Sequence, residues 1–220
     1  MKPLKFFIAA IILSCASCVT SMQPLVTSKE IITDDRLAGT WVQKDTEFNI
    51  ELFKTSMLKS KLDKVMKGKA KLVDTDLDDV KLKEKAYLLS YKKQKRTYFF
   101  LVSLISINEK LFADIYPFDL QDPANDEAGL GKENDFLTGY SIARLEIKDK
   151  TTISVDFLDG ELIKKQVLAG NMRLSHEYDP LFGSFMITAS SSELQQFIRK
   201  YGNDPRFFPS NNSITLTRKG

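Results

Sequence analysis

The feature that most restricts the fold of this chain is a long apolar segment followed at once by a turn and a second apolar segment. The first segment, Thr97–Ile107 (TYFFLVSLISI), is rich in aromatic and β-branched residues, which favour strands. The turn 108–110 and the segment Leu111–Tyr116 follow, and Pro117 is expected to end the second strand. This pattern predicts an antiparallel hairpin within an antiparallel sheet.

Shorter segments in which apolar and polar residues alternate occur along most of the remaining chain. Such alternation is typical of strands that bury one face. The predicted strands are Thr40–Gln43, Glu47–Phe53, Val80–Leu88, Gly139–Ile147, Thr151–Phe157, Arg173–His176, Gly183–Ala189 and Ser213–Arg218.

Two helices are predicted among these strands. The first, Glu161–Leu168, is followed by Gly170 as a stop signal. The second begins after a capping box formed by Ser190 and Glu193 and ends at Gly202. Many short antiparallel strands with two short α-helices predict a mainly β fold, built as a barrel or a sandwich.

The first residues have the layout of a secretory signal. Lys2 and Lys5 precede the apolar run Phe6–Leu13, and small residues follow it. The run is far shorter than the roughly 20 residues that a membrane-spanning helix needs. The segment is therefore expected to be removed rather than to remain as a spanning anchor.

Both cysteines of the chain lie directly after this apolar run. Cys18 follows the small residues Ala16 and Ser17, and this arrangement resembles the lipobox of bacterial lipoproteins, in which such a cysteine is acylated. Cys15 is the alternative acylation site, although cleavage before it would leave a spare thiol in an oxidising compartment. The predicted organisation is a signal peptide over 1–17, a lipid anchor with a flexible tether over 18–35, and a barrel domain over 36–220.

Composition limits the partners of the processed protein. The formal charge of the whole chain is +3, and loss of Lys2 and Lys5 leaves it nearly neutral. Near neutrality and secretion both argue against a dedicated nucleic-acid binder. No disulfide framework is available, so the 15 Phe and 7 Tyr residues must help to hold the fold by packing alone.

A short motif near the start of the predicted barrel domain resembles a known family. Gly39-Thr40-Trp41 is similar to the Gly-x-Trp start of the first barrel strand in lipocalins and related calycins. The resemblance implies that Trp41 closes one end of a barrel and that a basic residue near the chain's end, Arg218, packs across its indole. Thr138-Gly139-Tyr140 loosely resembles a second element of that family.

The chain as a whole resembles small lipocalin-like lipoproteins of Gram-negative bacteria. The segments that carry this resemblance are Leu37–Trp41, Leu111–Pro117 and Thr188–Tyr201. It implies an antiparallel lipocalin-like β-barrel that is lipid-anchored in the bacterial cell envelope, at the outer membrane. It brings no agreed activity and no cofactor.

A lipocalin-like barrel can either hold a ligand or be filled by its own side chains. If a cavity exists, the candidates to line it are Phe99, Leu101, Ile105, Tyr116 and Tyr140. The segment 117–135 would then gate the cavity. The alternative is a filled core, with the lysine-rich segment Lys54–Lys71 and the two helices presented to a partner protein or to the cell wall.

Candidate chemistry is sparse. The single histidine, His176, lacks a nucleophile motif around it, and a strand-edge surface role is the simpler interpretation. The acidic stretch Asp74–Asp79 lacks the glycine and the glutamate of a calcium loop, and one histidine cannot build a usual zinc site. We therefore expect a non-enzymatic protein without a metal or a cofactor.

Overall fold

The hairpin that the sequence predicts is present in the computed structural model, which describes residues 20–55, 84–93, 96–118 and 139–220. Its strands are β5 (Arg96–Ile107) and β6 (Lys110–Phe118), paired antiparallel. Asn108 and Glu109 both have a positive φ, 49° and 62°, as a tight two-residue hairpin turn requires.

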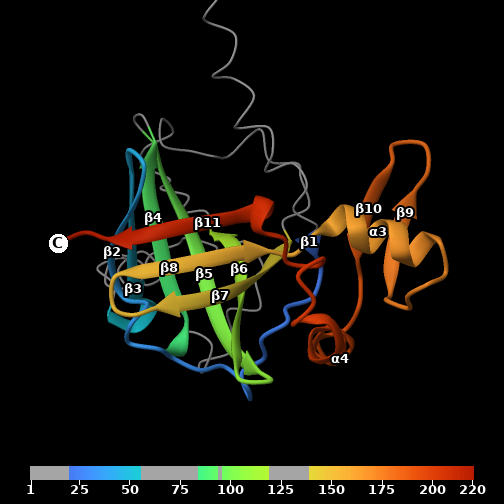
Figure 1. Cartoon of the computed structure of the whole chain (residues 1–220), viewed down its shortest axis with the longest axis horizontal. Helices are drawn as coiled ribbons and strands as arrows, with labels where there is room; N and C mark the ends of the chain where they lie inside the picture. The colour runs from blue at the N-terminus through green and yellow to red at the C-terminus, as the bar shows by residue number, and fades with distance from the viewer. Residues whose placement is uncertain (1–19, 56–83, 94–95, 119–138) are drawn as a thin grey trace, which may run out of the picture.

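Eight antiparallel strands close into a barrel (Figure 1). The ring runs β6-β5-β4-β3-β2-β11-β8-β7, and pairing of β6 with β7 closes it. The other barrel strands are β2 (Gly39–Gln43), β3 (Thr46–Leu52), β4 (Tyr87–Lys93), β7 (Tyr140–Lys148), β8 (Thr152–Phe157) and β11 (Ser213–Arg218). The predicted fold class is confirmed, and the barrel is consistent with a lipocalin-like fold.

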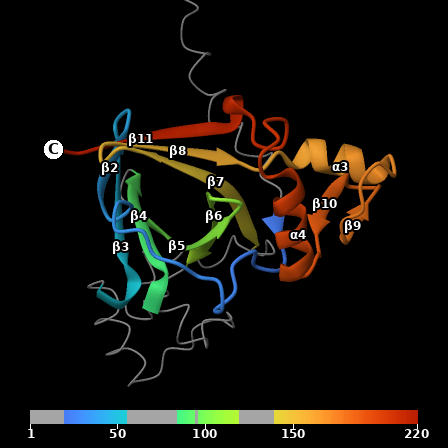
Figure 2. The same ribbon diagram turned by 60° about the horizontal axis from the view of Figure 1, so that its bottom comes forward.

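A second layer covers one side of the barrel (Figures 1 and 2). It consists of α3 (Gly160–Leu168), β9 (His176–Asp179), β10 (Ser184–Ile187) and α4 (Ser191–Tyr201), joined to β7 through the short strand β1 (Thr20–Ser21). Short 3-10 turns occupy Phe53–Thr55 and Ser210–Asn212. We call this assembly the helical layer.

Both helices begin as their sequences predict. The side chain of Asp159 caps α3 by accepting a hydrogen bond from the Leu162 backbone N–H, and Ser190 with Glu193 forms a complete capping box on α4. Gly170, with φ 72°, follows α3 in the left-handed conformation that stops a helix.

Register divides the barrel side chains into an inner and an outer face. Residues paired across antiparallel strands share a face, and neighbours along a strand alternate. The inner face belongs to one hydrophobic core, which includes Trp41, Val102 and Leu104. The outer face on the side of the helical layer belongs to a second core, which includes Ile105 and Phe112 together with apolar residues of α3 and α4.

The leader, residues 20–35, packs against the barrel, whereas the sequence led us to expect a flexible tether over 18–35. Leu25, Val26 and Ile31 are almost completely buried, and the Ile32 backbone N–H donates to the Leu104 carbonyl. The stretch is mostly polar and has no regular period, so its three apolar residues gave no sign that they pack into the second core. The leader is therefore a part of the fold.

Three predicted boundaries are wrong. Glu84 and Lys85 are helical and β4 starts at Tyr87, because a short alternation of lysines fits a helical turn as well as a strand. β9 starts at His176, after buried residues that anchor the preceding loop. Pro117 lies within β6, at a point where β6 has passed its last partner in β7 and a proline is tolerated.

Several sequence predictions lie outside the described residues. They are the acylation sites Cys15 and Cys18, nearly all of the lysine-rich segment 54–71, the acidic stretch 74–79, and most of the predicted gate over 117–135.

Candidate functional site

One end of the barrel is closed by the tryptophan and the arginine that the lipocalin resemblance pairs. The Arg218 guanidinium carbon lies 4.2 Å from the centroid of the Trp41 ring. The guanidinium also donates hydrogen bonds of 2.6–2.9 Å to the carbonyls of Arg36, Ala38 and Lys150. The indole N–H donates to the Leu37 carbonyl at 2.9 Å. The last barrel strand thus fastens the segment 36–38, directly after the leader, across this end.

Glycine at position 39 is required by this closure. Gly39 has φ 141°, and a Cβ added there would lie 2.2 Å from Nη1 of Arg218. The Gly-x-Trp motif therefore has a local physical cause: the glycine makes room for the guanidinium, and the tryptophan lies beneath it.

Exposure varies among the inner side chains of the barrel. Trp41, Leu104 and Ile153 are fully buried. At the end where β6 ends and β7 begins, Phe100, Ile115, Phe157 and Ile214 are only partly buried. At the end that Arg218 closes, Leu52, Leu111 and Ile147 are also partly buried. Partly exposed inner apolar side chains therefore occur at both ends, and we refer to the end that Arg218 does not close as the accessible end.

Aromatic rings gather in the accessible half. Tyr91 stacks on Tyr98 with ring centroids 5.1 Å apart and lies 6.0 Å from Phe100. Phe48 is tilted against Tyr91 at 5.4 Å. Rings arranged in this way offer large apolar surfaces to a molecule that enters the barrel.

The five residues that the sequence suggested as cavity lining all lie on the outer face. Leu101 pairs with Tyr116, whose ring lies 4.8 Å from that of Tyr140, and Phe99 and Ile105 point the same way from β5. Ile105 is 2 % exposed within the second core. The structure thus brings Leu101, Tyr116 and Tyr140 together, but outside the barrel interior.

Sequence reasoning missed the inner residues because β5 is apolar on both faces. In TYFFLVSLISI, alternation defines two faces without saying which one turns inward. A usable signal lay in the neighbouring strand: Glu47, Asn49 and Glu51 of β3 are polar, so their face points outward, and Phe48 and Ile50 point inward. Pairing then carries this assignment across β4 to β5.

A buried carboxyl group lies between the outer face and the leader. Asp114 of β6 is 2 % exposed, and its Oδ2 accepts a hydrogen bond of 2.7 Å from the Val26 backbone N–H. Its Oδ1 is buried and has no hydrogen-bond partner among the described residues. Burial raises the pKa of the Asp114 carboxyl to about 7. Its surroundings are apolar core, so its role is to hold the leader.

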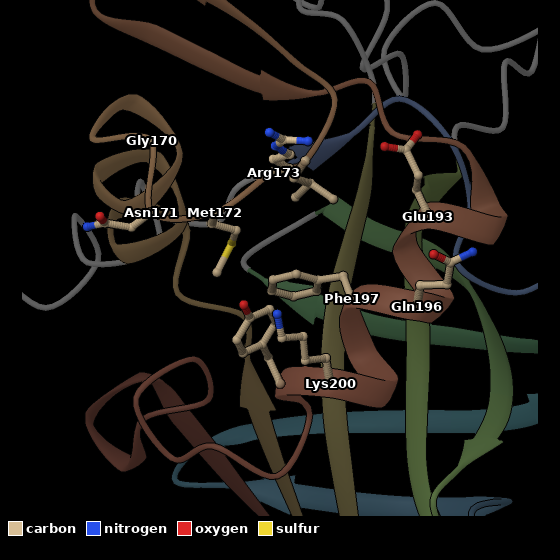
Figure 3. A pocket seen from close by; sticks show the side chains of 10 residues that line it. Gly170, Asn171, Met172, Arg173, Glu193, Gln196, Phe197 and Lys200 are labelled. Carbon is tan, nitrogen blue, oxygen red and sulfur yellow. The ribbon is translucent and has the colours of Figure 1, made fainter.

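A cleft of about 510 Å³ opens on the surface of the helical layer (Figure 3). Its floor is apolar and includes Met172, Leu174 and Phe197, which are largely buried. Arg173 and Lys200 stand at its rim, and neither forms an ion pair with another described residue. The cleft suits a group that is apolar at one end and anionic or polar at the other.

One carboxylate at the rim of this cleft is already engaged. Glu193 accepts hydrogen bonds from the Ser175 hydroxyl and the Ser190 backbone N–H. These bonds, with that of Ser175 the larger, hold the pKa of the Glu193 carboxyl below its usual value. The negative charge of Glu193 thus fixes the start of α4, while Nζ of Lys200 lies 4.9 Å from the centroid of the Tyr201 ring.

The single histidine is placed at the base of the β9–β10 hairpin. Nδ1 of His176 lies 2.9 Å from the Leu174 carbonyl, and its ring stacks on Phe185 with centroids 5.3 Å apart. Within residues 20–55, 84–93, 96–118 and 139–220, no group of three or more metal-ligating side chains is gathered. No helix in the same ranges is both long and apolar enough to span a bilayer.

A scan against protein-family models, a search of curated proteins and a search of solved structures each found no match to this chain.

Proposed function

We propose that this protein is a non-enzymatic lipoprotein of the bacterial cell envelope, anchored at the outer membrane, which binds a hydrophobic small molecule or lipid inside its barrel. The observation that carries the binding proposal is the group of aromatic and aliphatic side chains that point inward at the accessible end and stay partly exposed. Apolar side chains that point inward yet stay partly exposed leave a surface that a ligand would cover.

The chemistry of the inner face favours an uncharged or largely apolar ligand. Among the described inner-facing side chains between Arg218 and the accessible end, the residues are aliphatic, aromatic, small or uncharged polar. Arg218 itself is engaged with Trp41 and three carbonyls. A charged group placed deep in the described part of this barrel would meet no charged partner other than Arg218, and its desolvation would oppose binding.

The binding proposal is tested by filling the accessible half of the barrel. For native mass spectrometry before and after organic extraction, the full-length protein is kept in detergent, so that no nanodisc lipid is present. Binding of the neutral fluorophore N-phenylnaphthylamine is then measured in nanodiscs for Ile115→Trp, with empty nanodiscs as the blank. The inward indole should weaken binding by about tenfold, equal to about 1.4 kcal/mol.

The matched control is Thr97→Trp, an exposed position on the outer face of the same barrel. This variant should bind the fluorophore like the unmodified protein. Equal binding by Ile115→Trp and Thr97→Trp, with no extractable mass in either, would show that the barrel is filled and that no ligand site exists inside it.

The anchor is tested separately through the two cysteines. Metabolic labelling with palmitate should be lost in Cys18→Ser and retained in Cys15→Ser. The opposite result would move the acylation site to Cys15. Absence of label from the unmodified chain would remove the anchor from the proposal and leave the binding experiment unaffected.

A second candidate function is supported by the cleft of the helical layer. Its apolar floor, with Arg173 and Lys200 at the rim, would suit an envelope partner protein or a cell-wall component. A photo-crosslinker at Gln196, which is exposed on the same rim, should then capture one reproducible product in cells. Capture only by a crosslinker at the exposed outer-face position Thr97 would count against this cleft.

A further inference from the structure

Two large apolar residues are almost fully exposed at the tip of the β9–β10 hairpin. Leu181 and Phe182 expose 88 % and 86 % of their surfaces. They lie in the turn 180–183 at the upper right of Figure 1, at the end of the hairpin away from α4. Adjacent exposed apolar side chains on a protruding turn mark a contact surface.

The turn is held in a defined shape. Oδ1 of Asp179 accepts a hydrogen bond of 2.8 Å from the Leu181 backbone N–H and also contacts that of Phe182 at 3.4 Å. Gly183 supplies the left-handed residue, with φ 66°. Nζ of Lys164 on α3 donates to the Gly183 carbonyl at 2.7 Å. The helix therefore braces the turn, and the backbone presents the two apolar side chains outward.

The first described residues run beside this hairpin in a fixed direction. β1 pairs with β10 in parallel, with Ser21 opposite Ile187. The N-terminal end of β1 and the N-terminal end of β10 therefore lie on the same side, and β10 begins directly after the tip. Thr20 is level with Met186, so the tip extends beyond Thr20 by three to four residues, about 10–13 Å.

Chain length keeps the proposed acylation site close to Thr20. Cys18 precedes Thr20 by two residues, which can span at most about 7 Å. Cys15, the alternative, precedes it by five residues, which span at most about 17 Å. Because the leader from Thr20 onward is packed into the fold, neither distance can be extended by a tether.

We propose that Leu181 and Phe182 insert into the lipid bilayer that holds the N-terminal acyl chains. This inference rests on the proposed lipid anchor. An anchor that starts within about 7 Å of Thr20 brings the membrane surface to the level of the hairpin tip, and the tip presents the two most exposed large apolar side chains of the described chain to it. The domain is thereby held in one orientation on the membrane by two contacts, the acylated cysteine and the tip.

The test is a tryptophan at the tip. The acylated full-length protein carrying Phe182→Trp is reconstituted in phosphatidylcholine vesicles with plain or brominated acyl chains. We expect a blue shift of the new emission and its quenching by the brominated lipid. The native Trp41 is buried and contributes the same background to every variant, so it is subtracted with the unmodified protein.

The matched control is Lys110→Trp, an exposed residue at the β5–β6 turn, which lies at the bottom of Figure 1, away from the hairpin tip. Its emission should be unshifted and unquenched. Mass spectrometry of each sample first establishes that the acyl chain is present, so that loss of the anchor and failure of insertion are distinguished.

Each outcome has a defined meaning. Quenching of the Phe182→Trp variant and not of Lys110→Trp supports insertion. An acylated Phe182→Trp protein whose new emission stays unquenched overturns insertion while the anchor stands.

Discussion

The two faces of the barrel wall are both apolar beside the helical layer, yet they are packed differently. On the outer face, Ile105 and Phe112 are sealed beneath the leader and α4, with 2 % and 1 % exposed. On the inner face, Trp41 and Leu104 are fully buried, whereas Phe48 and Phe100 are only partly buried. Apolar character alone therefore does not indicate a ligand site. What separates the two faces is whether other parts of the same chain already cover them.

The largest expected effect comes from truncating a buried aromatic side chain on the outer face. Phe112→Ala should lower the free energy of unfolding by about 3–5 kcal/mol, because Phe112 packs on Phe208 and contacts the backbone region of Gly202 with little room to collapse. Phe100→Ala on the inner face should cost clearly less, since part of that ring is already exposed. Urea denaturation of both variants measures the difference. Equal losses would mean that the inner face is as tightly packed as the outer face.

The next effect concerns the charge of Asp114. With a pKa of about 7 in the folded protein against about 4 in the unfolded chain, the folded state binds more protons between these values. The contribution of this group to stability is therefore fully present below about pH 4 and is lost as the pH rises toward 7, by up to about 1.4 kcal/mol per pH unit.

Replacement of Asp114 by asparagine should remove this pH dependence while keeping an acceptor for the Val26 backbone N–H. Subtracting the pH profile of Asp114→Asn from that of the unmodified protein isolates the contribution of this group. A flat difference between pH 4 and 7 would show that the carboxyl is ionised throughout and lies in a wetter place than its burial indicates.

The smallest expected effect comes from the capping box of α4. It tests whether this helix stabilises the outer face without affecting ligand binding inside the barrel. Ser190→Ala removes the capping-box hydroxyl and should cost about 1 kcal/mol of stability. Fluorophore binding inside the barrel should be unchanged. The exposed Ser192→Ala on the same helix is the control and should cost little. Loss of binding in Ser190→Ala alone would show that the helical layer and the barrel interior are coupled.

Local sequence signals predicted the elements well and the arrangement of the faces less well. Helix caps at Asp159, Ser190 and Glu193, and the alternation in β3, β7 and β8, depend on neighbouring residues and are visible in the sequence. The fold class and the juxtaposition of Trp41 and Arg218 followed from strand count and from a short motif.

Features that depend on contacts distant in sequence were not predicted. The inward direction of Phe100 is set by pairing across three strands, and the burial of Leu25 and Asp114 is set by the leader meeting β6 and α4. The exposed hairpin tip at Leu181 and Phe182 lies between two predicted strands, and no sequence pattern marked it as a surface feature. Such features arise from tertiary packing, which no local pattern encodes.

The docked leader also sets an order of events during biosynthesis. The Leu25 carbonyl accepts a hydrogen bond from Gln195, a residue 170 positions later, and β1 pairs with β7 and β10, which are made in the second half of the chain. The leader cannot settle until α4 has been synthesised, and closing so long a loop is slow. It therefore docks late, after the barrel strands and the helical layer that receive it have formed.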